Sequence, residues 1–122
     1  MNLFIVEDNP IILNALVATL EELAPVRVLG TAADEEQAVS WLQDHSREVD
    51  VLIIDIFLRS GSGLGVLRAA AELPGPPRRV VLTNYATPEM RERCLALGAD
   101  TVFDKSSDLD RLIGYCGGSM TN

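Results

Sequence analysis

The sequence predicts an α/β domain in which helices cover both faces of a parallel sheet of five strands. Short apolar runs of strand length alternate with helical patterns five times along the chain. Strands that alternate with helices in this way are typical of parallel sheets. Several runs are apolar at every position, as expected for strands covered on both faces. The length of 122 residues fits one domain and leaves little room for a second.

The apolar runs locate the strands. Val51 to Ile54 is the clearest of them, because it is apolar at every position and is closed by Asp55. The five expected strands cover residues 3–6, 26–29, 51–54, 80–82 and 101–103.

Capping signals and breakers locate the helices. Asn9 precedes a proline at the first helical position, and Asp34 is placed to cap the second helix. A loop with three glycines (Gly61, Gly63 and Gly65) leads into the third helix. The expected helices run over about 10–23, from Asp34 onward, up to about Leu73, from Pro88 to Gly98, and over about 108–115. We expect a core over about 2–116 and a frayed tail over 117–122.

Composition and charge exclude several functions. Eighteen acidic and ten basic residues give a net charge of −8, which argues against direct nucleic-acid binding by this domain. The longest apolar runs are too short to cross a bilayer, so we expect no membrane insertion. No secretory segment leads the chain, and Cys94 and Cys116 lack metal-ligand spacing, so both are expected to be structural thiols. These features predict a cytoplasmic protein.

Four of the five expected strands end in residues able to do chemistry. Glu7 and Asp8 close the first, Asp55 the third and Thr83 the fourth, and Lys105 follows the fifth. In an open parallel sheet the carboxyl ends share one edge, and ligands bind where the strand order reverses. For the order 2-1-3-4-5 the reversal lies between the first and third strands. Glu7, Asp8 and Asp55 are therefore expected to meet there.

Such a cluster needs a cation or a proton. Two unit charges about 4 Å apart repel by about 4 kcal/mol at an effective dielectric of about 20. Carboxylate oxygens, with room for water and a phosphate, suit Mg²⁺ or, as an alternative, Mn²⁺. Asp55 could then act as a nucleophile and form an acyl phosphate. Lys105 could neutralise one phosphate oxygen, and Thr83 could donate a hydrogen bond to another.

Four segments together carry a resemblance to a known family. They are LFIVEDNP (3–10), VLIIDIFLRSGSG (51–63), VVLTN (80–84) and GADTVFDKS (98–106). With them the sequence resembles the receiver domain of two-component response regulators over nearly its whole length. The resemblance implies a flavodoxin-like doubly wound sheet in the order 2-1-3-4-5 with five helices, and a signalling domain that is not an enzyme in the ordinary sense.

The resemblance also implies roles for individual residues. Glu7 and Asp8 match the family's acidic pair, with Asp8 expected as the direct metal ligand. Asp55 matches the phosphoacceptor, Thr83 the switch hydroxyl and Lys105 the family's lysine. The backbone carbonyl two residues after the phosphoacceptor also binds the metal in this family, and here it belongs to Phe57.

The implied partners follow from the same family. A histidine kinase, a histidine phosphotransfer protein or a small phosphodonor would supply the phosphoryl group. Phosphorylation would change the surface of helix 4, strand 5 and helix 5, where family members dimerise or meet a downstream target. With no output domain in 122 residues, the effect must pass through another protein or a homodimer, unless the chain is part of a longer regulator.

Several positions differ from the family's usual residues. They are Arg59 in place of proline, Asn84 in place of a small residue, Ser106 in place of proline and Val102 in place of the switching aromatic residue. Phe103 lies next to Val102 but should point to the other face of its strand. Phe57 and Tyr85 flank the expected site, and their bulk predicts a phosphoryl group that decays slowly, because it would block the attacking water.

Three other functions fit part of the pattern. A haloacid dehalogenase-type phosphatase would need a second aspartate two residues after Asp55, where Phe57 stands. A flavin-binding electron carrier would need a first loop rich in Gly, Ser and Thr, and Glu7 with Asp8 would repel its phosphate. A pseudo-receiver that docks partners without phosphorylation stays open as the alternative, although no acid, phosphoacceptor or lysine is missing.

Overall fold

The computed structural model describes residues 1–117, and these form a five-stranded parallel sheet with helices on both faces. The strand order is β2-β1-β3-β4-β5, with every neighbouring pair parallel. The strands are β1 (Asn2–Val6), β2 (Arg27–Ala32), β3 (Val51–Ile54), β4 (Arg78–Thr83) and β5 (Thr101–Asp104). The predicted fold class and strand order are confirmed.

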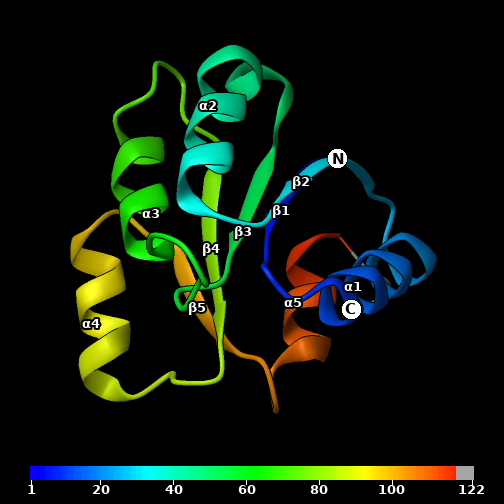
Figure 1. Cartoon of the computed structure of the whole chain (residues 1–122). Coiled ribbons are helices and arrows are strands. Elements are labelled where there is room, and N and C mark those ends of the chain that lie inside the picture. The colour runs from blue at the N-terminus through cyan, green and yellow to red at the C-terminus, as the bar shows by residue number, and fades with distance from the viewer. Residues whose placement is uncertain (118–122) are drawn as a thin grey trace.

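Five helices lie within this range; four connect successive strands and the fifth follows the last strand. They are α1 (Pro10–Leu23), α2 (Glu35–His45), α3 (Gly63–Ala71), α4 (Pro88–Ala96) and α5 (Leu109–Tyr115), with a short 3₁₀ turn over Ser46–Glu48. Figure 1 shows α2, α3 and α4 on one face of the sheet and α1 and α5 on the other. No helix among residues 1–117 is both long enough and apolar enough to span a bilayer.

Two hydrophobic cores lie on the two faces of the sheet. Because side chains alternate along a strand, Phe4 and Val6 enter the core under α2, α3 and α4, while Leu3 and Ile5 enter the core under α1 and α5. All four residues of β3 are buried, as its unbroken apolar sequence predicts. Val102 and Phe103 fall into opposite cores, which confirms that Phe103 does not take the place of Val102.

Side-chain caps begin the helices where the sequence predicts them. The Asn9 side chain accepts hydrogen bonds from the amides of Ile11 and Ile12, and Asp34 accepts one from Gln37. Past the end of α4, Gly98 has a φ of 107°, a left-handed conformation that favours glycine.

Several element boundaries differ from the prediction. Strand β4 was expected over 80–82 but runs from Arg78 to Thr83, because its pairing with β3 begins at Arg78. Strand β2 was expected over 26–29 but runs to Ala32, because β1 pairs with it along its whole length and continues through Gly30. The third helix begins at Gly63, so Gly63 and Gly65 belong to α3 and not to the loop before it. A side chain at Gly63 would collide with the carbonyl oxygen of Asp55, so glycine is needed where α3 approaches β3. Beyond Gly117, the tail predicted to fray lies outside the described residues.

The two cysteines are buried apolar groups. Cys94 and Cys116 are both fully buried. Burial raises the pKa of the Cys94 thiol, and it raises the pKa of the Cys116 thiol to about 11. Because the thiolate is the reactive form, we expect both to resist alkylation in the native protein and to react fully after unfolding. Mass spectrometry after iodoacetamide treatment checks this; native labelling as fast as that of a free thiol would contradict it.

Candidate functional site

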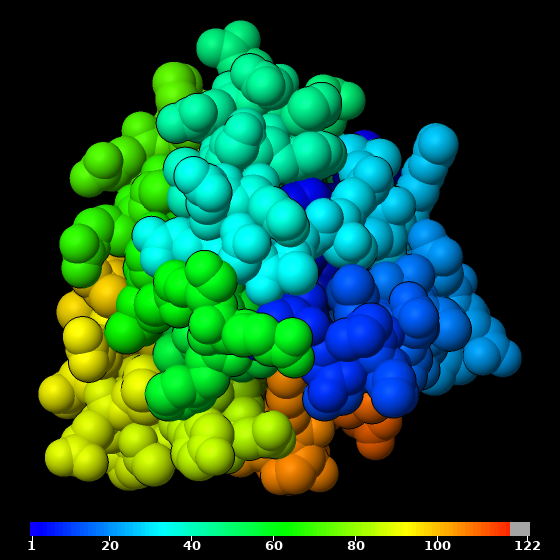
Figure 2. All heavy atoms as spheres, viewed as in Figure 1, coloured from blue at the N-terminus to red at the C-terminus, as the bar shows by residue number. Residues whose placement is uncertain are grey.

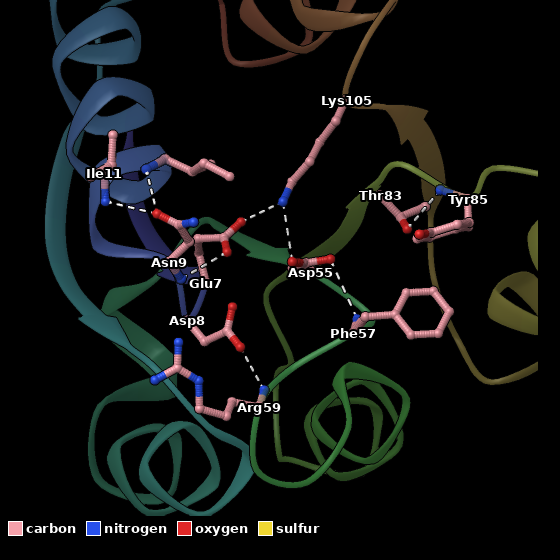
Figure 3. Close-up of polar contacts among 11 residues, drawn as sticks. Glu7, Asp8, Asn9, Ile11, Asp55, Phe57, Arg59, Thr83, Tyr85 and Lys105 are labelled. Carbon is pink, nitrogen blue, oxygen red and sulfur yellow. Dashed lines mark hydrogen bonds and ion pairs between the residues drawn. The ribbon is translucent and has the colours of Figure 1, made fainter.

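Three acidic side chains and one lysine meet at the carboxyl edge of the sheet (Figure 3). Glu7 and Asp8 follow β1, Asp55 follows β3 and Lys105 follows β5. One carboxyl oxygen from each of the three acids lies within 4.8 Å of the others. Lys105 Nζ lies 2.5 Å from Glu7 Oε1 and 3.1 Å from Asp55 Oδ2. The strand order thus brings residues from the beginning, middle and end of the chain into one cluster.

The backbone at these positions continues the hydrogen bonding of the sheet. The amide of Glu7 donates to the carbonyl of Ala32, that of Asp55 to Val6 and that of Lys105 to Thr83, at 2.9–3.0 Å. Glu7, Asp55 and Lys105 are therefore each fixed to the sheet by a backbone hydrogen bond, one position beyond the last residue of the strand.

The cluster is largely removed from water. Glu7 is 3% exposed, Asp55 9%, and the Lys105 side chain 12%. Burial raises the pKa of Asp55; the charge of Lys105 opposes this rise and the charge of Glu7 adds to it. Burial acts to lower the pKa of Lys105, but its bonds and charge interactions with Glu7 and Asp55 outweigh burial and raise that pKa. The lysine is thus held as a cation between two acids.

Asp8 lies beside this ion pair but is bound by the backbone of another loop. Its Oδ2 accepts a hydrogen bond of 2.5 Å from the amide of Arg59, in the loop between β3 and α3. Glu7 Oε2 accepts from the amide of Asn9 at 3.0 Å. Asn9 therefore caps α1 and orients Glu7 at once, a second role that its place in the sequence did not reveal.

Thr83 and Phe57 complete the set of predicted residues. Thr83 is fully buried, and its Oγ1 accepts from the amide of Tyr85 at 3.1 Å. The amide of Phe57 lies 3.4 Å from Asp55 Oδ1. The rings of Phe57 and Tyr85 pack edge to face, 4.9 Å between centroids, and are 53% and 59% exposed. They form an aromatic pair beside Asp55 (Figure 3).

The donor set fits a small hard cation. Three carboxylates face one ammonium, so negative charge remains when all four groups are ionised. All the donors are oxygens, which suits Mg²⁺ or Mn²⁺ rather than zinc. Both oxygens of Glu7 already have partners, in Lys105 and in Asn9. Asp8 has a hydrogen bond on Oδ2 alone among the described residues, so it is the best placed of the three acids as a direct ligand, whereas Glu7 and Asp55 both hold Lys105.

A groove beside Lys105 is a further feature of the site. It has a volume of about 330 Å³ and lies between α1 and the start of α5. Ile12 and Leu109 give it apolar walls, and Asn84 and Lys105 line it with polar groups. Sequence reasoning missed Ile12 and Leu109, because an apolar residue on a helix gives no sign by itself that its side chain will face solvent.

The fold and the site together define a doubly wound α/β domain whose switch-point crevice carries an acidic cluster and a lysine. The chain belongs to the response regulator receiver domain family, whose model matches residues 3–116. The family consists of signalling domains of two-component systems. The resemblance stated from the sequence is confirmed.

Individual relatives agree with this assignment. The chain is 31% identical over 112 residues to the uncharacterized transcriptional regulatory protein YvfU of Bacillus subtilis, covering 92% of this chain and 55% of YvfU. It is 23% identical to the response regulator UvrY of Escherichia coli, covering 88% of this chain and 48% of UvrY. The chain thus spans about half the length of the curated relatives it matches.

Solved structures share the fold. A CheX–CheY complex with BeF3 and Mg²⁺ from Borrelia burgdorferi matches with a TM-score of 0.83 at 24% identity, covering 93% of this chain and 84% of that one. A Burkholderia pseudomallei response regulator with a phosphorylated aspartic acid and a calcium ion matches with a TM-score of 0.82 at 22% identity, covering 94% and 65%.

Proposed function

We propose that this domain accepts a phosphoryl group on Asp55 in a reaction that depends on Mg²⁺ or Mn²⁺. The observation that carries the proposal is the ammonium group of Lys105, bonded to both Asp55 and Glu7 inside a cluster of three acids. A buried carboxylate beside a fixed cation can act as a nucleophile whose product carries more negative charge than it does.

The transfer moves one phosphoryl group between two proteins. A carboxylate oxygen of Asp55 attacks the phosphorus of a phosphohistidine; the new O–P bond forms as the P–N bond breaks, and the imidazole leaves with the bonding electrons. Lys105 balances charge on the phosphoryl oxygens. Asp8, Asp55 and the Phe57 carbonyl would hold the metal, with Glu7 in support. The ion would supply electrostatic stabilisation of those oxygens.

Phosphorylation would reach the outer surface through the loop after β4. We propose that the Thr83 hydroxyl turns to donate a hydrogen bond to the new phosphoryl group and no longer accepts one from the amide of Tyr85. Arg91, in the helix α4 that follows this loop, donates to the carbonyls of Ala86 and Val102 at 3.1 and 2.8 Å and lies 3.7 Å from Asp108. Movement of the loop would therefore change the positions of α4, β5 and α5 together.

The partners are proposed by class. A histidine kinase or histidine phosphotransfer protein would donate the phosphoryl group, and the groove at Ile12 and Leu109 lies beside the site where such a donor must approach. The output would be a homodimer, a downstream protein or a further part of a longer regulator, in the cytoplasm and without nucleic-acid contact by this domain. The alternative is a pseudo-receiver that docks partners unphosphorylated.

Phosphate uptake from a small phosphodonor distinguishes a phosphoacceptor domain from a pseudo-receiver. We expect the mass of one phosphoryl group to be added in the presence of Mg²⁺, and none in a chelator or in the Asp55→Asn variant. The site would then be a working phosphoacceptor. A folded protein that binds Mg²⁺ yet takes up no phosphate would favour the pseudo-receiver.

The aromatic pair is expected to prolong the phosphorylated state. The exposed rings of Phe57 and Tyr85 pack together beside Asp55 (Figure 3), and we propose that they hinder a water that attacks the phosphoryl group. Phe57→Ala or Tyr85→Ala should hasten loss of phosphate about tenfold, since about 1.4 kcal/mol of barrier corresponds to that factor. Leu23→Ala, an exposed apolar position at the far end of α1, is the control. A wild-type half-life of only seconds would count against the idea.

A further inference from the structure

The loop between β3 and α3 (residues 55–62) is held from outside the acidic cluster by one residue, Glu35 in the first turn of α2. Glu35 Oε1 accepts a hydrogen bond of 2.9 Å from the amide of Ser62. The amide of Glu35 donates to the carbonyl of Ser60 at 3.3 Å. Figure 2 shows the loop, in green, against the cyan start of α2. One residue of α2 thus binds two backbone groups of this loop.

Two glycines, by having no side chain, make room for the side chain of Glu35. A side chain at Gly61 would come within 2.5 Å of Glu35 Cβ and 2.9 Å of Oε1. A side chain at Gly65, in the first turn of α3, would overlap Glu35 Oε2. The Glu35 carboxylate therefore lies across the N-terminal turn of α3, where negative charge is favoured. The three residues fit one another closely, although Glu35 lies about 30 positions earlier in the chain.

The other side of the same loop faces the acids. The amide of Arg59 donates to Asp8, and the amide of Phe57 lies beside Asp55. Between Asp8 and Glu35, the loop is thus held on both sides within a few residues: Arg59 by Asp8, and Ser60 and Ser62 by Glu35. Loss of the contacts on one side is therefore expected to loosen the backbone that makes the contacts on the other side.

We propose that Glu35 is a positioning residue for the proposed phosphoacceptor site: it fixes the β3–α3 loop so that Asp8 and the Phe57 carbonyl stay arranged for a divalent cation beside Asp55. The role of Glu35 in metal binding rests on the proposed function, whereas the contact between α2 and this loop does not depend on it. Groups that orient metal ligands from outside the ligand set change metal affinity about 10- to 100-fold when removed.

The first experiment compares two neighbouring acids. Glu35→Ala removes the carboxylate that accepts from Ser62 and keeps the backbone hydrogen bond to Ser60. Glu36→Ala removes the same charge from an exposed position in the same helical turn. Calorimetric titration should show Mg²⁺ binding about tenfold weaker in Glu35→Ala and nearly unchanged in Glu36→Ala. Glu35→Gln keeps an oxygen acceptor for Ser62 and should restore most of the affinity.

A second readout needs no metal. In Mg²⁺-free protein, the Ser62 and Arg59 amides should exchange hydrogen faster in Glu35→Ala than in Glu36→Ala, while amides of β3 stay unchanged. Equal exchange and equal Mg²⁺ affinity in the two variants would overturn the proposal. Uniformly faster exchange, β3 included, would also overturn it, because that would mark a general loss of stability.

A double-mutant cycle tests the contact itself. Gly65→Ala favours the helix by propensity, but its methyl group would displace the Glu35 carboxylate. We therefore expect Gly65→Ala alone to weaken Mg²⁺ binding severalfold, and to have no further effect once Glu35 is alanine. Additive effects would argue against the contact. If the metal responds as expected but Asp55 takes up no phosphate, the proposed function fails while the role of Glu35 stands.

Discussion

Replacing Lys105 by Met should destabilise the metal-free protein by about 2 kcal/mol, because removing one member of a buried ion pair leaves uncompensated charge, here reduced by partial access to water. Glu7 and Asp55 would then face each other without the ammonium that bridges them at 2.5 and 3.1 Å. Added Mg²⁺ should restore part of the loss in Lys105→Met, since the ion would supply the missing positive charge.

The effect on phosphoryl transfer should be larger still. Loss of a single preorganised charge partner of the reacting oxygens costs about 100-fold or more in rate. Urea unfolding with and without Mg²⁺ measures the first effect, and phosphate uptake from a small donor measures the second. Arg111→Met, which removes an exposed cation from α5, should change neither. If Lys105→Met is as stable as Arg111→Met, the ion pairs of Lys105 with Glu7 and Asp55 do not stabilise the fold.

The pH dependence of this contribution has a definite sign. The pKa of Lys105 is raised in the folded protein above its unfolded value of 10.5. The stabilisation by Lys105 is therefore fully present below about that pH, and it is lost as the pH rises through the folded pKa. The difference in stability between wild type and Lys105→Met should accordingly shrink only in strongly alkaline solution.

The Asp55→Asn variant should lose all phosphate uptake and yet be more stable than wild type at neutral pH without Mg²⁺. Burial raises the pKa of Asp55, so the folded state binds its proton more tightly than the unfolded state does. Ionisation of Asp55 thus costs stability, and this cost grows as the pH rises from the unfolded value of 3.8 through the folded pKa. Asparagine escapes that cost.

Thermal unfolding tests this expectation. A gain of about 1 kcal/mol would raise the Tm by about 4 °C for a domain of this size. The gain should narrow as the pH falls toward 3.8, where Asp55 is protonated in both states. With Mg²⁺ the wild type should have the higher Tm, because it keeps the third carboxylate for the ion. Asp44→Asn, at an exposed position on α2, is the control. A lower Tm for Asp55→Asn without metal would contradict the account.

The sequence was sufficient for the parts of the fold that depend on local signals. Val51–Ile54 is apolar throughout and became β3 without adjustment, and Asn9 and Asp34 cap the helices as predicted. The end of β2 depends instead on its pairing with β1, which no local pattern carries. Gly63 and Gly65 were mistaken for loop residues, because their place in a helix depends on Asp55 and Glu35, far from them in the chain.

For the candidate site too, one part could be predicted from the sequence and another could not. The positions of Glu7, Asp8, Asp55 and Lys105 follow from strand ends and strand order, so their proximity could be predicted. Their individual partners could not. That Glu7 is held by Asn9, and Asp8 by the amide of Arg59, depends on loop conformations of a few residues. The sequence offers only neighbouring polar residues at these places, which are common in any loop.

The backbone hydrogen bonds that run one residue past β1, β3 and β5 have a practical consequence for engineering. They tie Glu7, Asp55 and Lys105 to the hydrogen-bonded sheet and not to the solvent-facing parts of the helices. If the proposed function holds, exchanging exposed positions of α1 or α4 for those of a relative should leave the acidic cluster and Lys105 in place, so that the outer surface and the proposed phosphoacceptor site can be redesigned separately.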